Sequence, residues 1–247
     1  MAYLNTKTVL VTGANRGIGA AIVRELLTSG ATKIYAAARN TASLPDFGDA
    51  RVVPLQLDIT NEASVKAAAK TAADTDVLIN NAGTAKIADV IEAPLADLKA
   101  DMDTNYYGTL SVLRAFVPGF VARNSGTIAN VASVVGLTSA APLGGYSASK
   151  AALHSLTQTV RVNLRNTNVK VLGIYPGPID TELARDLPYD KASPESAAKL
   201  IIDGINAGET YIFPDPVAQH IGQLWETDGR ALDVALAQRA DQLEAAE

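Results

Sequence analysis

Residues 8–28 read TVLVTGANRGIGAAIVRELLT, and this stretch decides the fold class. Its first five residues are β-branched or apolar, which predicts a buried strand, and Gly13, Gly17 and Gly19 follow directly. A helix is expected over 17–29, and Gly30 suits its C-terminal cap. A strand, a glycine-rich turn and a helix in this order are typical of the start of a parallel α/β sheet.

The same alternation of short apolar runs and longer helical stretches continues along the chain. Most of the runs are apolar throughout, as expected of parallel strands that are covered on both faces. Further strands are predicted at 33–38, 51–57, 76–80, 126–132, 170–175 and 210–213. Further helices are predicted at 61–73, 95–123, 146–166 and 194–207. The predicted fold is α/β, a Rossmann-like, doubly wound parallel sheet of about seven strands with helices on both faces.

The length and composition suit one domain. A chain of 247 residues, of which 48% are apolar and 19% charged, can bury one large core, and no repeat or linker marks a second domain. We expect a single domain over 1–247, in which 215–247 is a polar, Ala- and Gln-rich helical extension. This extension is expected to pack on the domain or on another subunit.

Charge and residue usage exclude several classes of function. The formal net charge is −5 and no long run of Lys or Arg occurs, so neither a nucleic acid nor a membrane is an expected partner. The chain has no cysteine, and His154 and His220 lie far apart, so no metal site and no Ser-His-Asp triad is expected. With no signal pattern and no apolar run of membrane-spanning length, the chain is expected to be soluble and cytoplasmic.

The three glycines after the first strand predict a binding site for a dinucleotide. Without a Cβ, glycine lets backbone N–H groups approach a pyrophosphate, and the helix N-terminus adds partial positive charge. The spacing is G-x-x-x-G-x-G rather than G-x-G-x-x-G, and tight strand–helix turns also use glycine for structural reasons. The position after an N-terminal strand favours nucleotide binding.

The end of the second predicted strand indicates which dinucleotide binds. Enzymes that use NAD place an acid about 20 residues beyond the glycines to bond the ribose 2′-hydroxyl, whereas those that use NADP accommodate an arginine there. Here Arg39 stands in that region, and Arg16 stands within the glycine-rich turn. Both could be ordinary surface arginines. Since the acid is missing, the two guanidinium groups favour the 2′-phosphate of NADP(H).

A second group of residues suits proton transfer to a carbonyl oxygen. Tyr146 and Lys150 are four residues apart, so they share a helix face, and Ser133 lies thirteen residues before Tyr146 at the end of a predicted strand. A free phenol titrates near pH ~10, and a nearby ammonium lowers that value. The Ser133 hydroxyl could hold the substrate oxygen. Each residue alone has an ordinary structural explanation, and only the three together favour catalysis.

Asn105 lies within the apolar stripe of the helix predicted over 95–123. A polar amide on such a face needs hydrogen-bond partners. Either it bonds its own helix or a neighbour, or it holds a water that relays protons from Lys150 to the solvent. The spacing alone does not choose between these two interpretations.

In these motifs the chain resembles the short-chain dehydrogenase/reductase family, in particular its NADP(H)-preferring carbonyl reductases. The matching residues follow the family's order across residues 7–181, about three quarters of the chain. They are Thr12-Gly13-x-x-x-Gly17-Ile18-Gly19, Asp58, Asn80-Asn81-Ala82-Gly83, Asn105, Ser133, Tyr146-x-x-x-Lys150 and Pro176-Gly177. The combination is highly specific, although its members separately are not.

The resemblance implies a role for each of these residues. Tyr146 would be the general acid/base, Lys150 would lower its pKa and bond the nicotinamide ribose, Ser133 would orient the carbonyl, and Asn105 would anchor a proton-relay water. Asp58 and Ile59 would lie at the adenine, Asn81 to Gly83 along the adenosine ribose, and Ile179 and Thr181 at the nicotinamide carboxamide. The full set expected at the cofactor is Gly13, Asn15, Arg16, Gly17, Ile18, Gly19, Arg39, Asp58, Ile59, Asn81, Ala82, Gly83, Tyr146, Lys150, Pro176, Gly177, Ile179 and Thr181.

The expected function is the reversible, NADPH-dependent reduction of a ketone or aldehyde to an alcohol. The substrate pocket is expected between segments 134–143 and 179–189, whose leucines suggest a mainly apolar small molecule. Its expected residues are Ser133, Leu143, Tyr146, Leu183, Leu187 and Tyr189. Two alternatives stay open: an NAD-dependent alcohol, sugar or steroid dehydrogenase of the same family, and a dinucleotide-binding sensor without turnover.

The C-terminal region departs from the family's commonest bacterial pattern. Residues 209–214 read ETYIFP, where Thr-Gly followed by Asp-Gly-Gly is usual, and this puts the usual tetramer contacts in doubt. The expected assembly is a homodimer, through the helices that carry Asn105 and Tyr146, or a homotetramer.

Overall fold

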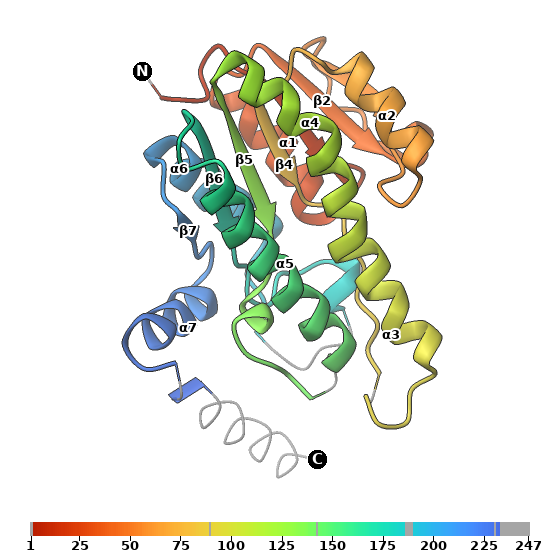
Figure 1. The fold of residues 1–247 in the computed structure, drawn as a ribbon, viewed down its shortest axis with the longest axis vertical. Helices are drawn as coiled ribbons and strands as arrows, with labels where there is room; N and C mark the ends of the chain where they lie inside the picture. The colour runs from red at the N-terminus through yellow and green to blue at the C-terminus, as the bar shows by residue number, and fades with distance from the viewer. Residues whose placement is uncertain (1, 89, 142, 186–189, 230, 233–247) are drawn as a thin grey trace.

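The computed structural model describes residues 2–88, 90–141, 143–185, 190–229 and 231–232. These form a seven-stranded parallel sheet in the order β3-β2-β1-β4-β5-β6-β7, with helices on both faces (Figure 1). The sheet confirms the predicted doubly wound α/β fold. Its strands are β1 Thr8–Thr12, β2 Lys33–Ala38, β3 Val52–Gln56, β4 Val77–Asn80, β5 Gly126–Val131, β6 Val169–Ile174 and β7 Tyr211–Ile212.

The helices divide between the two faces of the sheet. In Figure 1, α2, α4 and α5 cover the near face, and α1 and α6 lie behind the sheet. The helices are α1 Gly17–Thr28, α2 Glu62–Thr71, α3 Leu95–Met102, α4 Thr109–Arg123, α5 Gly144–Asn163, α6 Pro194–Ala207 and α7 Pro216–Thr227. Short 3₁₀ turns cover Thr41–Ser43, Val134–Gly136 and Glu182–Ala184.

Alternate side chains of the strands fill two hydrophobic cores. In β1, Val9 and Val11 join the core under α1 and α6, whereas Leu10 joins the core under α4 and α5. All three side chains are fully buried. Because successive side chains of a strand point to opposite faces, covering both faces requires the uninterrupted apolar runs seen in the sequence.

The single helix predicted over 95–123 contains a wider turn. After α3 the chain passes through a π-helical turn, Asp103–Gly108, and then continues as α4. Figure 1 shows α3 and α4 running on as one long column. A π turn holds one residue more than a regular turn. The side chains beyond it therefore face other directions than they would in an uninterrupted α-helix of the same sequence. The apolar periodicity of the sequence predicted the column but not this turn.

The strand order places a crevice at the carboxyl edge of the sheet. β1 has β2 on one side and β4 on the other, so the chain connections leave it in opposite directions. At such a switch point the loops that follow the strands separate and leave room for a ligand. Most residues predicted for the dinucleotide and for proton transfer follow one of the strands β1 to β6, and therefore lie at this edge.

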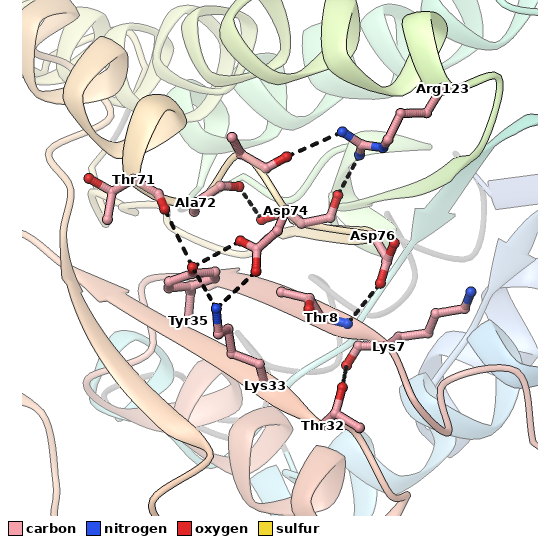
Figure 2. Close-up of polar contacts among 12 residues, drawn as sticks. Lys7, Thr8, Thr32, Lys33, Tyr35, Thr71, Ala72, Asp74, Asp76 and Arg123 are labelled. Atoms are coloured by element: carbon pink, nitrogen blue, oxygen red, sulfur yellow. Dashed lines mark hydrogen bonds and ion pairs between the residues drawn. The ribbon is translucent and has the colours of Figure 1, made fainter.

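The opposite, amino edge is closed by paired polar groups (Figure 2). Lys33 at the start of β2 donates to one oxygen of Asp74, and the Tyr35 hydroxyl donates to the other, both at 2.9 Å. The carboxylate of Asp76 accepts the backbone N–H of Thr8 at 2.9 Å. Each of these polar groups therefore has a partner within the described residues.

The C-terminal region folds back onto the carboxyl edge. Helix α7, Pro216–Thr227, has Asp215 as its N-cap. The helical extension predicted over 215–247 stays a prediction, because residues 230 and 233–247 lie outside the described residues. No helix in the described ranges combines the length and the apolar character needed to cross a bilayer.

Candidate active site

A cavity of about 870 Å³ opens at the carboxyl edge of the sheet. Its walls contain all the residues predicted for the cofactor, from Gly13 in the glycine-rich turn to Thr181 after β6. They also contain four residues predicted for the substrate, which are Ser133, Leu143, Tyr146 and Leu183. Leu187 and Tyr189, predicted for the same role, lie outside the described residues. The structure thus brings the two groups of motifs into one cavity.

The glycine-rich turn fits a pyrophosphate. Gly13 and Gly17 have φ values of +65° and +53°, which favour glycine, and a Cβ on Gly13 would lie 2.8 Å from the Cα of Ala82. A Cβ on Gly19 would collide with the carbonyl oxygen of Gly13. No side chain caps the N-terminus of α1, and the first turn of that helix lines the cavity. Backbone N–H groups in this position can bind an anion.

Asn81 holds the turn in shape. Its side-chain amide donates to the carbonyl oxygens of Thr12 and Gly13, at 2.9 and 3.1 Å. The Thr12 hydroxyl in turn accepts the backbone N–H groups of Asn81 and Ala82, at 3.0 and 2.9 Å. The resemblance implies that Asn81 lies along the adenosine ribose; in the structure its side-chain amide is bonded to the turn itself.

The two arginines expected at the 2′-phosphate have different surroundings. Arg39 is exposed at the end of β2, close enough to Asp58 for its charge to act on that carboxyl group. The pKa of Asp58 is lowered mainly by the hydrogen bond from Thr60, with Arg39 adding to the effect. Arg16 forms an ion pair with Glu182, in which the two side chains are 65% and 54% exposed. This pair joins the glycine-rich turn to the segment after β6.

Ser133, Tyr146 and Lys150 meet where β5 ends and α5 begins. The Ser133 hydroxyl donates to the carbonyl oxygen of Pro176 at 3.2 Å. It also lies close enough to Tyr146 to act on the pKa of the phenol as a hydrogen-bond partner. The Nζ atom of Lys150 donates to the carbonyl oxygen of Val131 at 2.8 Å and lies 5.6 Å from the centre of the Tyr146 ring. Lys150 is only 4% exposed. One helix face thus presents a phenol and an amine to the cavity, as their spacing predicted.

Burial controls the protonation of both groups. It raises the pKa of Tyr146 to about 12, although the hydrogen bond from Ser133 acts to lower it. It also lowers the pKa of Lys150 to about 8. The net shift of Tyr146 is opposite to the one that the family resemblance implies, because loss of water outweighs the neighbouring groups. Tyr146 is therefore a neutral phenol at neutral pH, which is the form that can donate a proton.

Asn105 lies in the π turn, fully buried behind the cavity wall. Its amide nitrogen donates to the carbonyl oxygen of Thr84 at 2.9 Å and to the Ser149 hydroxyl at 2.8 Å, and its oxygen accepts the N–H of Thr84 at 2.9 Å. Ser149 passes the contact on to the carbonyl oxygen of Tyr146 at 2.7 Å. The side chain of Asn105 is thus bonded to neighbouring residues, which is the first of the two interpretations of this residue. A water that relays protons would have to bond the main-chain carbonyl of Asn105.

Two parts of the site were not foreseen from the sequence. Val217 and Ile221 of α7 line the cavity, and Asp215 anchors this helix by accepting the N–H groups of Gly177 and Ala218, at 2.7 and 2.9 Å. The Asp-Pro pair at 215–216 was the feature of the sequence that could have predicted the start of α7.

The second part of the site that was not foreseen is Asp101, four residues before Asn105 and fully buried. Its spacing to Asn105 was a signal that both face one segment.

Known proteins share this architecture. A family model described as short chain dehydrogenase matches residues 7–192. An NADP-dependent 3-hydroxy acid dehydrogenase of Schizosaccharomyces pombe is 30% identical over 240 residues, covering 87% of this chain and 93% of the relative.

Solved structures agree with these matches. A short chain dehydrogenase from Burkholderia cenocepacia in complex with NADP superposes with a TM-score of 0.89 at 38% identity, covering 94% of this chain and 98% of the other. A short chain dehydrogenase/reductase from Burkholderia phymatum in complex with NAD gives a TM-score of 0.81 at 25% identity, covering 91% and 94%.

Proposed function

The chain belongs to the short-chain dehydrogenase family, and from that premise we propose that it reduces a ketone or aldehyde to an alcohol with NADPH, reversibly. One observation carries the proposal: Ser133, Tyr146 and Lys150 line the same cavity of about 870 Å³ as the glycine-rich turn. A dinucleotide bound to the turn and a carbonyl held by Ser133 would therefore share one cavity. The bound cofactor supplies the hydride.

NADP(H) is the proposed cofactor. Arg16 in the glycine-rich turn and Arg39 at the end of β2 both line the cavity, and β2 ends without the acid that NAD-dependent enzymes carry there. The relatives from S. pombe and B. cenocepacia are associated with NADP, and the one from B. phymatum with NAD. NAD(H) is therefore the alternative that an assay must exclude.

The residues of the chain divide the work of proton transfer. Ser133 holds the carbonyl oxygen, and the neutral Tyr146 donates its proton to that oxygen as hydride reaches the adjacent carbon. Negative charge then forms on the phenol oxygen, and the ammonium of Lys150 stabilises it. An ammonium has three N–H donors, of which one is directed to Val131, so two are left for groups in the cavity.

The walls of the cavity favour an uncharged, apolar substrate. Around Ser133 they carry Val134, Val135, Ala140 and Leu143, with Val217 and Ile221 from α7. Of the two arginines, Arg39 stands at the end of β2, which is separated from β5 by β1 and β4. A substrate carboxylate at Ser133 would therefore lie far from Arg39.

Steady-state rates test the proposal directly. Loss of NADPH absorbance is followed with a panel of ketones and aldehydes, and the reverse reaction with NADP⁺ and alcohols that include 3-hydroxy acids, because the S. pombe relative is named for them. NADH and NAD⁺ serve as matched controls. A preference for NADH would support the NAD-dependent alternative, and cofactor binding without any turnover would support a sensor.

The proposal includes a homodimer through α4 and α5. Exposed apolar side chains lie along this face, with Tyr107 58% exposed just before α4, Val121 41% exposed near its end, and Val162 59% exposed on α5. A second copy would remove them from water. Light scattering on the purified protein distinguishes a dimer, a homotetramer and a monomer, and a monomer would contradict this part of the proposal.

A further inference from the structure

Asp101 is a fully buried carboxylate with no part in the proton transfer described above. It lies in the last turn of α3. Burial raises its pKa, against hydrogen bonds from the backbone of Lys86 and the side chain of Thr84, which favour the ionised form. Taking a carboxylate out of water is costly, so its presence here calls for a physical reason.

The hydrogen bonds of Asp101 fix part of the cavity wall. One carboxylate oxygen accepts the Thr84 hydroxyl at 3.0 Å, and the other accepts the backbone N–H of Lys86 at 3.1 Å. Asn105, one turn further along the helix, bonds both the N–H and the carbonyl oxygen of Thr84 at 2.9 Å. The segment after β4 is therefore fastened to the helix at two successive turns.

This segment runs close to the catalytic lysine. A Cβ added to Gly83 would lie 2.8 Å from the side-chain oxygen of Asn105 and 3.5 Å from the Nζ atom of Lys150. Gly83 and Thr84 both line the cavity. A shift of the segment would therefore move the cavity surface next to Lys150, and the hydrogen bonds of Asp101 oppose such a shift.

The charge of Asp101 acts on the same group of residues. Within the described chain, the titratable groups that face it are Lys86 in the segment after β4, and Tyr146 and Lys150 on α5. Burial lowers the pKa of Lys150, and the charge of Asp101 opposes that shift. For Tyr146, burial raises the pKa and Asp101 raises it further.

We propose that Asp101 is a positioning residue for the reaction: it fastens the Thr84–Lys86 wall and supplies the negative charge that keeps Lys150 an ammonium and Tyr146 a phenol. The inference rests on the proposed function. Reduction needs both groups protonated at the start. Without the charge of Asp101, both would lose their protons at lower pH, so the alkaline limit of reduction would move downward.

The decisive variant is Asp101→Asn, which keeps the shape of the side chain and removes its charge. Initial rates of NADPH oxidation are measured with the best carbonyl substrate from pH 6.5 to 10.5. We expect the alkaline midpoint to fall by roughly half a unit to one unit, the size of an effect between nearby partly buried charges. Asp103→Asn is the matched control, since it removes the same charge two residues away at an exposed position, and it should keep the wild-type midpoint.

A second pair of variants tests the hydrogen bonds separately from the charge. Thr84→Val has nearly the same shape but no hydroxyl to donate, and Thr84→Ser restores the donor. We expect Thr84→Val to raise the KM for NADPH several-fold with an unchanged midpoint, and Thr84→Ser to recover most of the loss. This pair keeps the inference testable if Asp101→Asn does not fold.

A readout without turnover separates this inference from the proposed function. NMR titration of the Lys150 ammonium, assigned by its loss in Lys150→Met, should show a lower pKa in Asp101→Asn than in the wild type. If no carbonyl is reduced but this shift appears, the proposed function fails and the role of Asp101 stands. A folded Asp101→Asn variant with wild-type titration of Lys150 and an unshifted pH limit would overturn the inference, as would wild-type KM values in Thr84→Val.

Discussion

Each edge of the sheet carries a lysine beside a tyrosine, and the two pairs behave in opposite ways. At the amino edge the Nζ atom of Lys33 lies 5.0 Å from the centre of the Tyr35 ring, and at the carboxyl edge Lys150 lies 5.6 Å from that of Tyr146. Lys33 is partly exposed and its hydrogen bond to Asp74 raises its pKa, whereas burial lowers the pKa of Lys150 to about 8. The same pair of residue types forms a closed structural contact at one edge and lines an open cavity at the other. Only the pair of Lys150 and Tyr146 is removed from water, and no described carboxylate is hydrogen-bonded to this lysine.

The largest expected effect is the loss of kcat when the phenol of Tyr146, but not that of Tyr35, loses its hydroxyl group. Tyr146→Phe should lower kcat by roughly 10²–10⁴-fold, the usual contribution of a positioned acid, while NADPH binding persists. Tyr35→Phe is the matched control at the amino edge: it removes the bond to Asp74 and should leave kcat unchanged. Steady-state kinetics and fluorescence titration of NADPH measure both variants. Near-normal kcat in Tyr146→Phe would show that the proton comes from another group.

The two lysines should differ in stability as well as in activity. Lys150→Met should lose most turnover yet resist urea better than the wild type at pH 7, by about 1–3 kcal/mol, because it removes a buried charge that has no directly bonded carboxylate. Lys33→Met should lower the resistance to urea, because Asp74 loses its cation. A Lys150→Met variant less stable than the wild type would contradict the difference drawn between the edges.

The pH dependence of stability follows from the same shift. The pKa of Lys150 in the folded chain, about 8, lies below the ordinary lysine value, so the unfolded chain binds this proton more tightly. The destabilisation is present in full below pH about 8 and disappears as pH rises toward about 10.4. Urea unfolding at pH 7 and pH 10 should therefore show the advantage of Lys150→Met shrinking at the higher pH. An advantage that does not change with pH would mean that Lys150 titrates normally.

The pH dependence of kcat should also reflect the titration of Lys150. In the wild type, reduction should decline as pH rises through about 8, where Lys150 loses its charge, since the pKa of Tyr146 lies higher, at about 12. Lys33→Met should leave this decline in place. A pH–rate profile of kcat checks the expectation, and activity that persists undiminished to pH 10 would contradict it.

The smallest expected effect concerns the ion pair at the mouth of the cavity. A 2′-phosphate and Glu182 would compete for Arg16, so Glu182→Gln should tighten NADPH binding by roughly two- to fivefold, the range of an exposed ion pair, without changing NADH binding. Glu195→Gln removes an equal charge from another exposed position on the cavity wall and is the control. Equal gains in the two variants would point to general charge rather than to this pair.

Much of the fold could be predicted because its signals are local. β1 and β2 have the predicted bounds, and α6 begins at Pro194 and ends at Ala207 as expected. An uninterrupted apolar run of five or six residues predicts a buried strand, and a proline after a capping residue predicts a helix start, without knowledge of the rest of the chain. The membership of the cavity could be predicted for a related reason, since parallel strands bring the residues after them to one edge.

The contacts inside the site could not be predicted, because they join distant parts of the chain. Arg16 and Glu182 are 166 residues apart, and Asn105 and Ser149 are 44 apart. Motif spacing placed Asn105 at the site but did not reveal that Thr84 occupies its amide. The pKa of Tyr146 depends mainly on how deeply the fold buries its phenol, and the spacing of residues in the sequence does not predict the extent of that burial.

The π turn at Asp103–Gly108 makes the site sensitive to the deletion of a single residue from this part of the helix. The extra residue of such a turn is absorbed locally, so the regular helix on either side keeps its phase. A one-residue deletion inside the turn would therefore leave α3 and α4 in place and remove only the widened backbone that sets Asn105 against Thr84. We expect such a deletion to keep the fold and to disturb the hydrogen bonds between these two residues.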